Sequence, residues 1–423
     1  MDCKKLLEKI EEMPVVDTHE HFDRYSDTFG YNMPRFLYFS CYANTFSGYL
    51  PKEWIDILED PEEDEYRQFQ ALLEIRAPLK FTQCGFLMEE MARRAGIPLE
   101  EENFKAFQSW YAHRNAESVA AMNPQIRAYI CNSIGHPMFG GLAGLKGYMK
   151  PGMEPDPKIY RVLNITDFHC VTGKEQLNLI GRLADMEILS LQDWERAVEK
   201  VIRTFAGLGI VGFKELYLYF RPFQLELPNE ARAGQDLERI LRGENLSGKD
   251  TGTGLMDYMM FKVYEILSEY RMPVAVHTGC TITSAESALH FQDYMKIMNS
   301  VPEVNFDLLH LNYPVLESYM TILKSCPNAY GNCTWITSVD REYTKQYMNK
   351  VLDNVPIGHT SFFGGDRHCA GEPVGAVLCQ TRQILAEGLS EMIEKHYINE
   401  TNALEIAEMW LYENPKHLYR LTL

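Results

Sequence analysis

The stretch "MPVVDTHEHFD", residues 13–23, joins a short apolar run to two histidines. The apolar run is typical of a buried β-strand. Residues two apart in a strand face the same side, so His19 and His21, which flank Glu20, point in one direction. Because the chain has twelve histidines, such a pair is weak evidence on its own. What the pair does must therefore be judged from the segments that follow it.

Seven further apolar or β-branched runs follow, and longer helical patterns separate most of them. This alternation is typical of βα units around a parallel sheet. Together the eight segments predict an α/β fold, a distorted (β/α)8 TIM barrel that residues 1–423 form as a single domain. The predicted strands are "PVVDTH" (14–19), "IRAYICNS" (126–133), "IYRVLNI" (159–165), "GIVGFKEL" (209–216), "PVAVHTG" (273–279), "VNFDLLHL" (304–311), "NAYGNCTW" (328–335) and "SFFGGD" (361–366).

One region breaks this alternation, between the first and second predicted strands. Residues 45–125 contain "PKEWIDILEDPEEDEYRQFQALLEI" and "MEEMARRAGI", which are helical in pattern and strongly charged. We interpret the region as a helical insertion or cap at the mouth of the barrel. Residues 140–158 are predicted to be a loop. A regular helix is predicted over 190–209, where Ser190 can cap its start and glycines can end it.

Composition and charge exclude several classes of protein. The net charge of −18 argues against a nucleic-acid surface, which would need a basic face. No apolar run reaches the roughly 18 residues of a membrane span, and the N-terminal residues lack the apolar core of a signal peptide. We therefore predict a cytoplasmic protein that binds neither nucleic acid nor a membrane. The ten cysteines are expected to be free thiols, and homo-oligomerisation is left open.

Polar side chains also close several of the other predicted strands. His277 ends "PVAVH", His310 ends "VNFDLLH", Asp366 ends "SFFGGD", and Lys214 comes near the end of "GIVGFK". Each has an ordinary explanation by itself: a satisfied structural histidine, a turn aspartate, a lysine that reaches solvent. A parallel barrel, however, brings these strand ends into one ring. With the two histidines of the first strand, the set predicts a divalent metal site.

The order of these motifs resembles the amidohydrolase superfamily, in particular the amidohydrolase-related branch of TIM-barrel metal-dependent hydrolases. The resemblance spans all eight predicted strands and the C-terminus and leaves residues 45–125 outside it. It implies that His19, His21 and Asp366 bind one metal and that Asp366 also handles a proton of the bound water. The motifs that carry it are "VVDTHEHF", "VGFKEL", "VAVHTG", "DLLHLNYP", "NAYGNCTW", "FFGGD" and "ALEIAEMWLYENPKHLYRL".

Two features of the metal site stay open at this point. In superfamily members with two metals, a lysine at the end of the fourth strand is carboxylated and bridges the ions, and Lys214 stands at that place. In members with one metal this position takes no such part. His310 either binds a second metal or polarises the substrate, and His277 completes the ligand set. We expect one or two divalent ions, Zn²⁺ above others, with Asp366 and His310 as catalytic residues.

Substrate contacts are expected from the loops at the strand ends. Arg221 could hold a carboxylate with two hydrogen bonds, or it could be a surface arginine that pairs with Glu226 or Glu230. Arg367 and His368 are candidates for the same role. Trp335 and Tyr217 could wall an apolar pocket, although a core position suits both.

Three functions compete on this evidence. The first is a hydrolase of an amide, lactone or ester bond in a small, anionic molecule. The second is a uronate-isomerase-like enzyme, or a decarboxylase or hydratase that uses the same metal residues. The arginine close behind the strand-eight aspartate resembles the isomerase family, but that family has one residue between the two, and Lys214 fits it poorly. The third is a non-catalytic binding protein, which would have no reason to keep five ligand-type residues.

Overall fold

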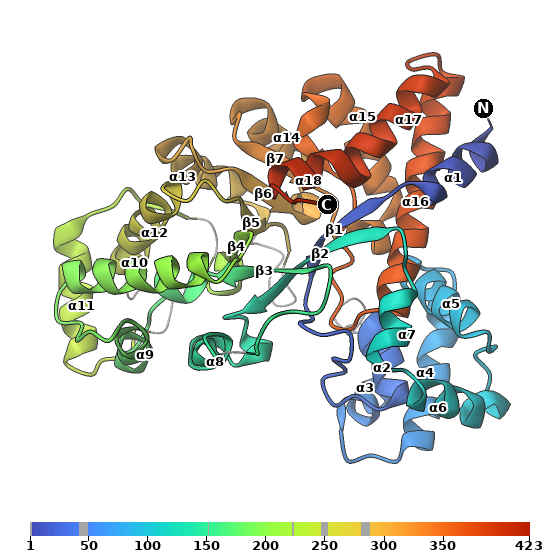
Figure 1. The fold of residues 1–423 in the computed structure, drawn as a ribbon, viewed down its shortest axis with the longest axis horizontal. Helices are drawn as coiled ribbons and strands as arrows, with labels where there is room; N and C mark the ends of the chain where they lie inside the picture. Colours follow the sequence, from blue (N-terminus) through green and yellow to red (C-terminus); the bar gives the residue numbers. More distant parts are fainter. Residues whose placement is uncertain (1, 42–49, 151, 222–223, 247–252, 281–287) are drawn as a thin grey trace.

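The computed structural model describes residues 2–41, 50–150, 152–221, 224–246, 253–280 and 288–423. Its eight strands are parallel and lie in sequence order, β1 to β8, as neighbours in one curved sheet (Figure 1). The predicted barrel is thereby confirmed. The strands are β1 (Val15–Glu20), β2 (Ile126–Ile134), β3 (Ile159–Asn164), β4 (Gly212–Glu215), β5 (Val274–His277), β6 (Phe306–Leu309), β7 (Ala329–Asn332) and β8 (Thr360–Ser361).

The residues after β8 complete the ring against β1. The amide of Thr18 donates to the Phe363 carbonyl (3.1 Å), and the amide of Asp366 donates to the His19 carbonyl (2.8 Å). The amide of His21 donates in turn to the Arg367 carbonyl (2.9 Å). These bonds bring the end of the eighth unit directly beside the two histidines of the first.

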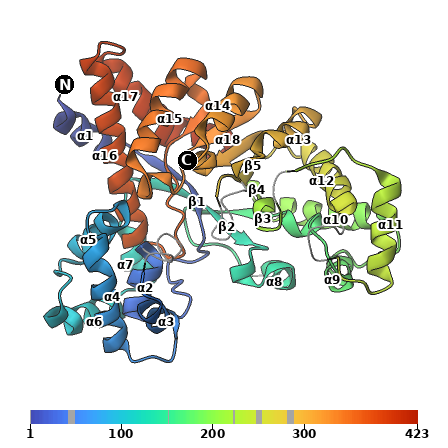
Figure 2. The same ribbon diagram turned by 180° about the vertical axis from the view of Figure 1, so that it is seen from behind.

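Helices surround the sheet, and the predicted helix over 190–209 is confirmed as α10, with Ser190 Oγ accepting from the Asp193 amide. Both views place α9–α12 and the helices between β1 and β2 on opposite sides of the barrel (Figures 1 and 2). Outside the region between β1 and β2, the helices are α1 (Cys3–Glu12), α8 (Gly141–Tyr148), α9 (Lys174–Ala184), α10 (Leu191–Gly207), α11 (Glu230–Leu241), α12 (Thr253–Ser268), α13 (Met295–Ser300), α14 (Leu316–Ser325), α15 (Arg341–Asn354), α16 (Glu372–Glu394), α17 (Glu400–Glu408) and α18 (Asn414–Leu418).

The region between β1 and β2 forms a group of helices at one side of the barrel (Figure 1). Its first helix begins at Met33, before the predicted start of the insertion at residue 45. Part of the prediction, residues 45–49, lies outside the described residues. The helices are α2 (Met33–Cys41), α3 (Lys52–Glu59), α4 (Glu65–Leu79), α5 (Gln83–Ala95), α6 (Phe104–Ala112) and α7 (Ala116–Ala121).

The prediction of a loop over residues 140–158 is wrong for its first half. Residues 141–148 form α8, which buries Leu142 and Leu145, three residues apart on one helical face. Burial of these two leucines outweighs the low helix propensity of the glycines in the segment.

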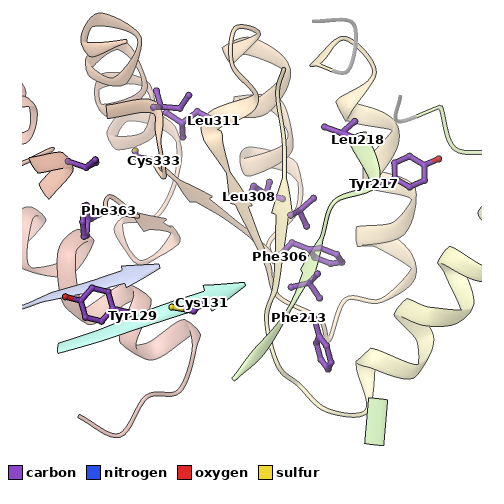
Figure 3. Close-up of a cluster of buried hydrophobic side chains, with 14 of the residues drawn as sticks. Tyr129, Cys131, Phe213, Tyr217, Leu218, Phe306, Leu308, Leu311, Cys333 and Phe363 are labelled. Atoms are coloured by element: carbon purple, nitrogen blue, oxygen red, sulfur yellow. The ribbon is translucent and has the colours of Figure 1, made fainter. Parts of the chain in front are cut away.

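Hydrophobic residues fill both sides of the sheet. Figure 3 shows Phe213 of β4 and Phe306 and Leu308 of β6 in the larger cluster, and all three are fully buried. A smaller cluster joins strand residues such as Val16 and Val162 to Tyr419 and its neighbours after α18. The C-terminal segment thus packs against the strands at the end of the barrel away from the polar strand ends.

Candidate metal centre and its cavity

Three predicted ligands converge where β1 meets the segment after β8. The Nε2 atom of His21 lies 2.9 Å from Asp366 Oδ1, and the Nε2 atom of His19 lies 3.5 Å from the same oxygen. One ligand atom from each residue lies within 4.8 Å of the other two. Two imidazole nitrogens and a carboxylate oxygen at this spacing form a donor set that a divalent metal can share.

The two glycines before Asp366 allow this convergence. A Cβ atom on Gly364 would collide with Thr334 Oγ1, and one on Gly365 would collide with Glu20 Oε1. Asp366 itself has φ of 56°, in the left-handed region. The "GGD" sequence is therefore more than a turn, because the chain must pass close to β1 to present the carboxylate to both histidines.

Two buried carboxyl groups of β1, Asp17 and Glu20, accept hydrogen bonds from the backbone on either side of Asp366. Asp17 Oδ1 accepts from the Gly365 amide (3.1 Å), and Glu20 Oε2 accepts from the Arg367 amide (2.6 Å). Burial raises the pKa of Asp17 to about 7 and raises that of Glu20 well above its usual range. The negative charge of Asp17 raises the pKa of Glu20 further, because two neighbouring carboxylates repel each other.

His277 and His310 are the other two histidines at the strand ends. The centroids of their imidazole rings lie 4.4 Å apart. His277 Nε2 is buried and has no hydrogen-bond partner among the described residues. His310 Nδ1 lies 3.0 Å from the Thr334 carbonyl, so its proton is on Nδ1 and its Nε2 carries a lone pair. Burial lowers the pKa of His277 and brings that of His310 to about 4. Both rings are therefore neutral and able to act as metal ligands.

Lys214 on β4 is fully buried, which contradicts the simple explanation of a lysine that reaches solvent. Its Nζ donates to the Glu215 carbonyl at 3.2 Å. Burial lowers the lysine pKa to about 7, although the charges of Asp366, Glu215 and Asp307 act in the opposite direction. The neighbouring Glu215 carboxylate turns away and accepts from Thr166 Oγ1 (2.8 Å) and pairs with His169 (2.7 Å).

A cavity of about 440 Å³ opens above these residues, a size typical of small-molecule sites. Two histidines lie beside His21 in it: the ring centroids of His136 and His368 are 4.7 and 5.6 Å from that of His21. The lining residues are His19, His21, Phe39, His136, Pro137, Met138, Leu216, Tyr219, Phe220, His277, Cys280, Trp335, Asp366, Arg367 and His368.

Several of the lining residues were not expected from the sequence, and His136 and Tyr219 are two of them. His136 comes two residues after the end of β2, so a search for polar residues behind every strand could have found it. Tyr219 follows β4, and its ring centroid lies 4.8 Å from that of His277. Its position depends on how the chain turns after the strand, and nothing in the local sequence indicated that turn.

The two arginines expected to contact substrate are both engaged with the protein. Arg221 Nη1 pairs with Asp257 Oδ1 at 3.2 Å, in place of the acids considered for it, and Arg221 is not among the residues that line the cavity. Arg367 lines the cavity, but its three guanidinium nitrogens donate to the Gly365 carbonyl, the Ser40 carbonyl and Ser338 Oγ, each at 2.8 Å.

The two expected wall residues take different places. Trp335 lines the cavity, with its ring centroid 5.8 Å from that of His310. Tyr217 is fully buried in the core and is absent from the lining.

All ten cysteines are free thiols, as expected. Among the described residues no helix has the length and apolar character needed to cross a membrane.

The chain matches the model of a known protein family. The amidohydrolase family model aligns with residues 181–421, more than half of the chain. The comparison with curated proteins gave no match.

Several solved structures share the fold at low sequence identity. Uronate isomerase from Thermotoga maritima is 16% identical with a TM-score of 0.74, over 99% of this chain and 97% of its own. Glucuronate isomerase from Caulobacter crescentus is 12% identical with a TM-score of 0.73, over 100% and 94%. A candidate metal-dependent hydrolase from Lactobacillus casei is 15% identical with a TM-score of 0.63, over 98% and 97%.

Proposed function

The chain belongs to the amidohydrolase family, and on that premise we propose that it is a metal-dependent hydrolase. It cleaves an amide, lactone or ester bond of a small molecule bound in the cavity. The observation that carries this proposal is the convergence of His19, His21 and Asp366 at the open end of the barrel. His277 and His310 stand beside them with free ring nitrogens.

The donor set fits a divalent ion such as Zn²⁺, which favours imidazole and carboxylate ligands. His19, His21 and Asp366 would hold one ion. Lys214, if carboxylated, would join His277 and His310 around a second. The Nδ1 bond of His310 to the Thr334 carbonyl supports a ligand role for this histidine, because its Nε2 then offers a lone pair and no proton. A bound ion would supply an activated water at neutral pH and would polarise the bond under attack.

Asp366 is suited to accept a proton. Burial acts to raise its pKa, but the hydrogen bond with His21 and the electrostatic effect of the neighbouring histidine rings hold that pKa well below its usual range. Asp366 is therefore ionised at neutral pH and can take the proton of the attacking water and pass it to the leaving group. Its position beside His19 and His21 keeps it at the reacting centre.

The proposal is tested with the metal-loaded protein and a panel of neutral esters, lactones and amides. Turnover is expected for at least one bond type. Asp366→Asn should lower kcat by about 10²-fold or more, because it removes the proton acceptor and a metal ligand together. His113→Ala, an exposed change at the C-cap of α6, should not lower kcat. No turnover of any hydrolysable bond by protein with full metal content would contradict the proposal.

A second candidate is a uronate-isomerase-like activity, and one observation favours it. The uronate isomerase fold matches this chain over nearly the whole length of both, including the region between β1 and β2. Against it, a sugar acid carries a carboxylate, and Arg367 is occupied by protein acceptors. The protein would be incubated with D-glucuronate, and NMR would detect any ketose formed. Formation of the ketose would indicate the isomerase and not the hydrolase, because an isomerase moves the carbonyl group and consumes no water.

A further inference from the structure

The lining of the cavity includes polar side chains of the metal site and aromatic side chains. The polar part consists of four metal-site residues, with His136 and His368 beside His21. The four are His19, His21, His277 and Asp366. The aromatic part consists of four side chains from three parts of the fold: Phe39 of α2, the adjacent Tyr219 and Phe220 after β4, and Trp335 after β7. Aromatic rings that converge on one cavity favour a flat, apolar group of a ligand.

The described lining holds little positive charge for a ligand. Arg367 is the one lysine or arginine in it, and each of its guanidinium nitrogens already donates to a protein acceptor. A negative charge far from the metal would therefore remain unbalanced.

His136 presents a hydrogen-bond donor to this space. The Met138 amide donates to its Nδ1 at 3.2 Å, so the proton of the neutral ring is on Nε2. The remaining ring group of His136 is thus an N–H, which binds an oxygen acceptor. His136 and His368 lie outside the group of His19, His21 and Asp366, whose ligand atoms are close to one another.

We propose that the substrate is an aromatic or similarly flat, unsaturated carbonyl compound whose ring packs against Phe39, Tyr219, Phe220 and Trp335 and whose oxygen accepts from His136. This inference rests on the proposed function and narrows it. The substrate expected from the sequence was anionic, whereas the substrate proposed here carries no charge on the part that lies away from the metal. His136 is a positioning and specificity residue.

The test compares three metal-binding probes on the metal-loaded protein by titration calorimetry: benzohydroxamate, acetohydroxamate and the para-carboxylated benzohydroxamate. The aromatic probe should bind roughly tenfold or more tightly than the methyl probe, as expected for burial of a ring. The added carboxylate should remove much of that advantage. Equal affinities for the first two probes, or tighter binding of the carboxylated one, would contradict the inference.

Variants assign the effect to residues. Trp335→Leu should weaken benzohydroxamate more than acetohydroxamate, and Phe81→Leu, a control whose ring is 79% exposed, should change neither. His136→Leu should weaken both probes, and His136→Gln, which keeps a donor, should restore part of the loss. Metal content, measured for each variant, excludes a damaged site. If both His136 and Trp335 variants bind like the wild type, the proposed contacts are wrong.

The two proposals can fail separately. Binding of benzohydroxamate as predicted, with no hydrolysis of any ester, lactone or amide, would contradict the hydrolase and support the pocket inference. Hydrolysis confined to polyhydroxylated lactones such as gluconolactone, with no turnover of the aromatic lactone dihydrocoumarin, would support the hydrolase and contradict the inference.

Discussion

At the scale of single residues, Gly365 shows most directly how the sequence makes the site. Its amide donates to Asp17, and it leaves space for the Glu20 carboxyl group where any side chain would collide. Asp366 follows it immediately. The position of the proposed ligand therefore depends on a residue that has no side chain of its own.

Gly365→Ala is expected to destabilise the protein by about 1–3 kcal/mol, the usual cost of an overpacked site, and to lower its metal content. Urea unfolding and elemental analysis measure the two effects. Gly358→Ala is the matched control, because a Cβ there meets nothing within 4 Å, and it should change stability by less than about 1 kcal/mol. Equal stability and metal content in the two variants would contradict the role given to Gly365.

The buried Asp307 predicts a pH dependence of stability. Its carboxyl group accepts from Tyr419 Oη (2.7 Å) and Asn332 Nδ2 (2.9 Å), yet burial raises its pKa from 3.8 to about 6. The folded state thus holds the proton more tightly than the unfolded state. The stability from this group is present below about pH 4 and is lost as the pH rises through about 6.

Asp307→Asn removes this titration and leaves a side chain of similar shape. The wild type should lose stability relative to the variant between pH 4 and 7, by at most about 3 kcal/mol for a shift of this size. Urea unfolding of both proteins at one-unit pH steps gives the difference. Parallel curves across that range would show that Asp307 has an ordinary pKa.

At the scale of elements, the strands could be predicted better than the segments between them. Each strand is a short apolar run closed by a polar residue, and both signals are local. The helix over 190–209 was equally clear, because Ser190 and the apolar spacing agree. The start of the insertion at Met33 and the helix α8 were missed, because the burial of Leu142 and Leu145 depends on neighbours far away in the sequence.

A buried ion pair ties β3 to the chain that leaves β1. Arg161 Nε and Nη2 donate to the two Asp23 carboxylate oxygens at 2.6 and 2.5 Å, and Ser133 Oγ donates to the same group at 2.8 Å. Asp23 lies two residues beyond His21. The pair therefore fixes the segment that carries the second histidine.

Arg161→Met should cost about 3–5 kcal/mol, because it leaves the Asp23 carboxylate buried without its partner. It should also weaken metal binding through the displaced His21. The matched control is Arg242→Met, which breaks an exposed i,i+4 pair with Glu238 and should cost less than about 1 kcal/mol. Thermal unfolding and metal titration check both variants. A cost as small as that of the control would contradict the proposed anchoring.

At the scale of the whole molecule, the barrel explains why residues so far apart in sequence could be grouped beforehand. A parallel barrel brings every strand end to one rim, so His19, His277, His310 and Asp366 needed only the fold to meet. The occupied arginines could not be foreseen in the same way. The partners of Arg367 are Ser40 and Ser338, on elements whose mutual contact has no signal in the sequence.

The proposed function requires that this rim hold a divalent metal, and the metal content per chain shows whether it does. Elemental mass spectrometry would be applied to protein purified without chelator in bicarbonate buffer, beside His19→Ala, Asp366→Asn, Lys214→Ala and the control His113→Ala. We predict one or two equivalents in the wild type and the control, with a clear loss in the His19 and Asp366 variants. A drop from two equivalents to one in Lys214→Ala would support a carboxylated lysine. No metal in the wild type, or full metal in both the His19 and Asp366 variants, would contradict the account.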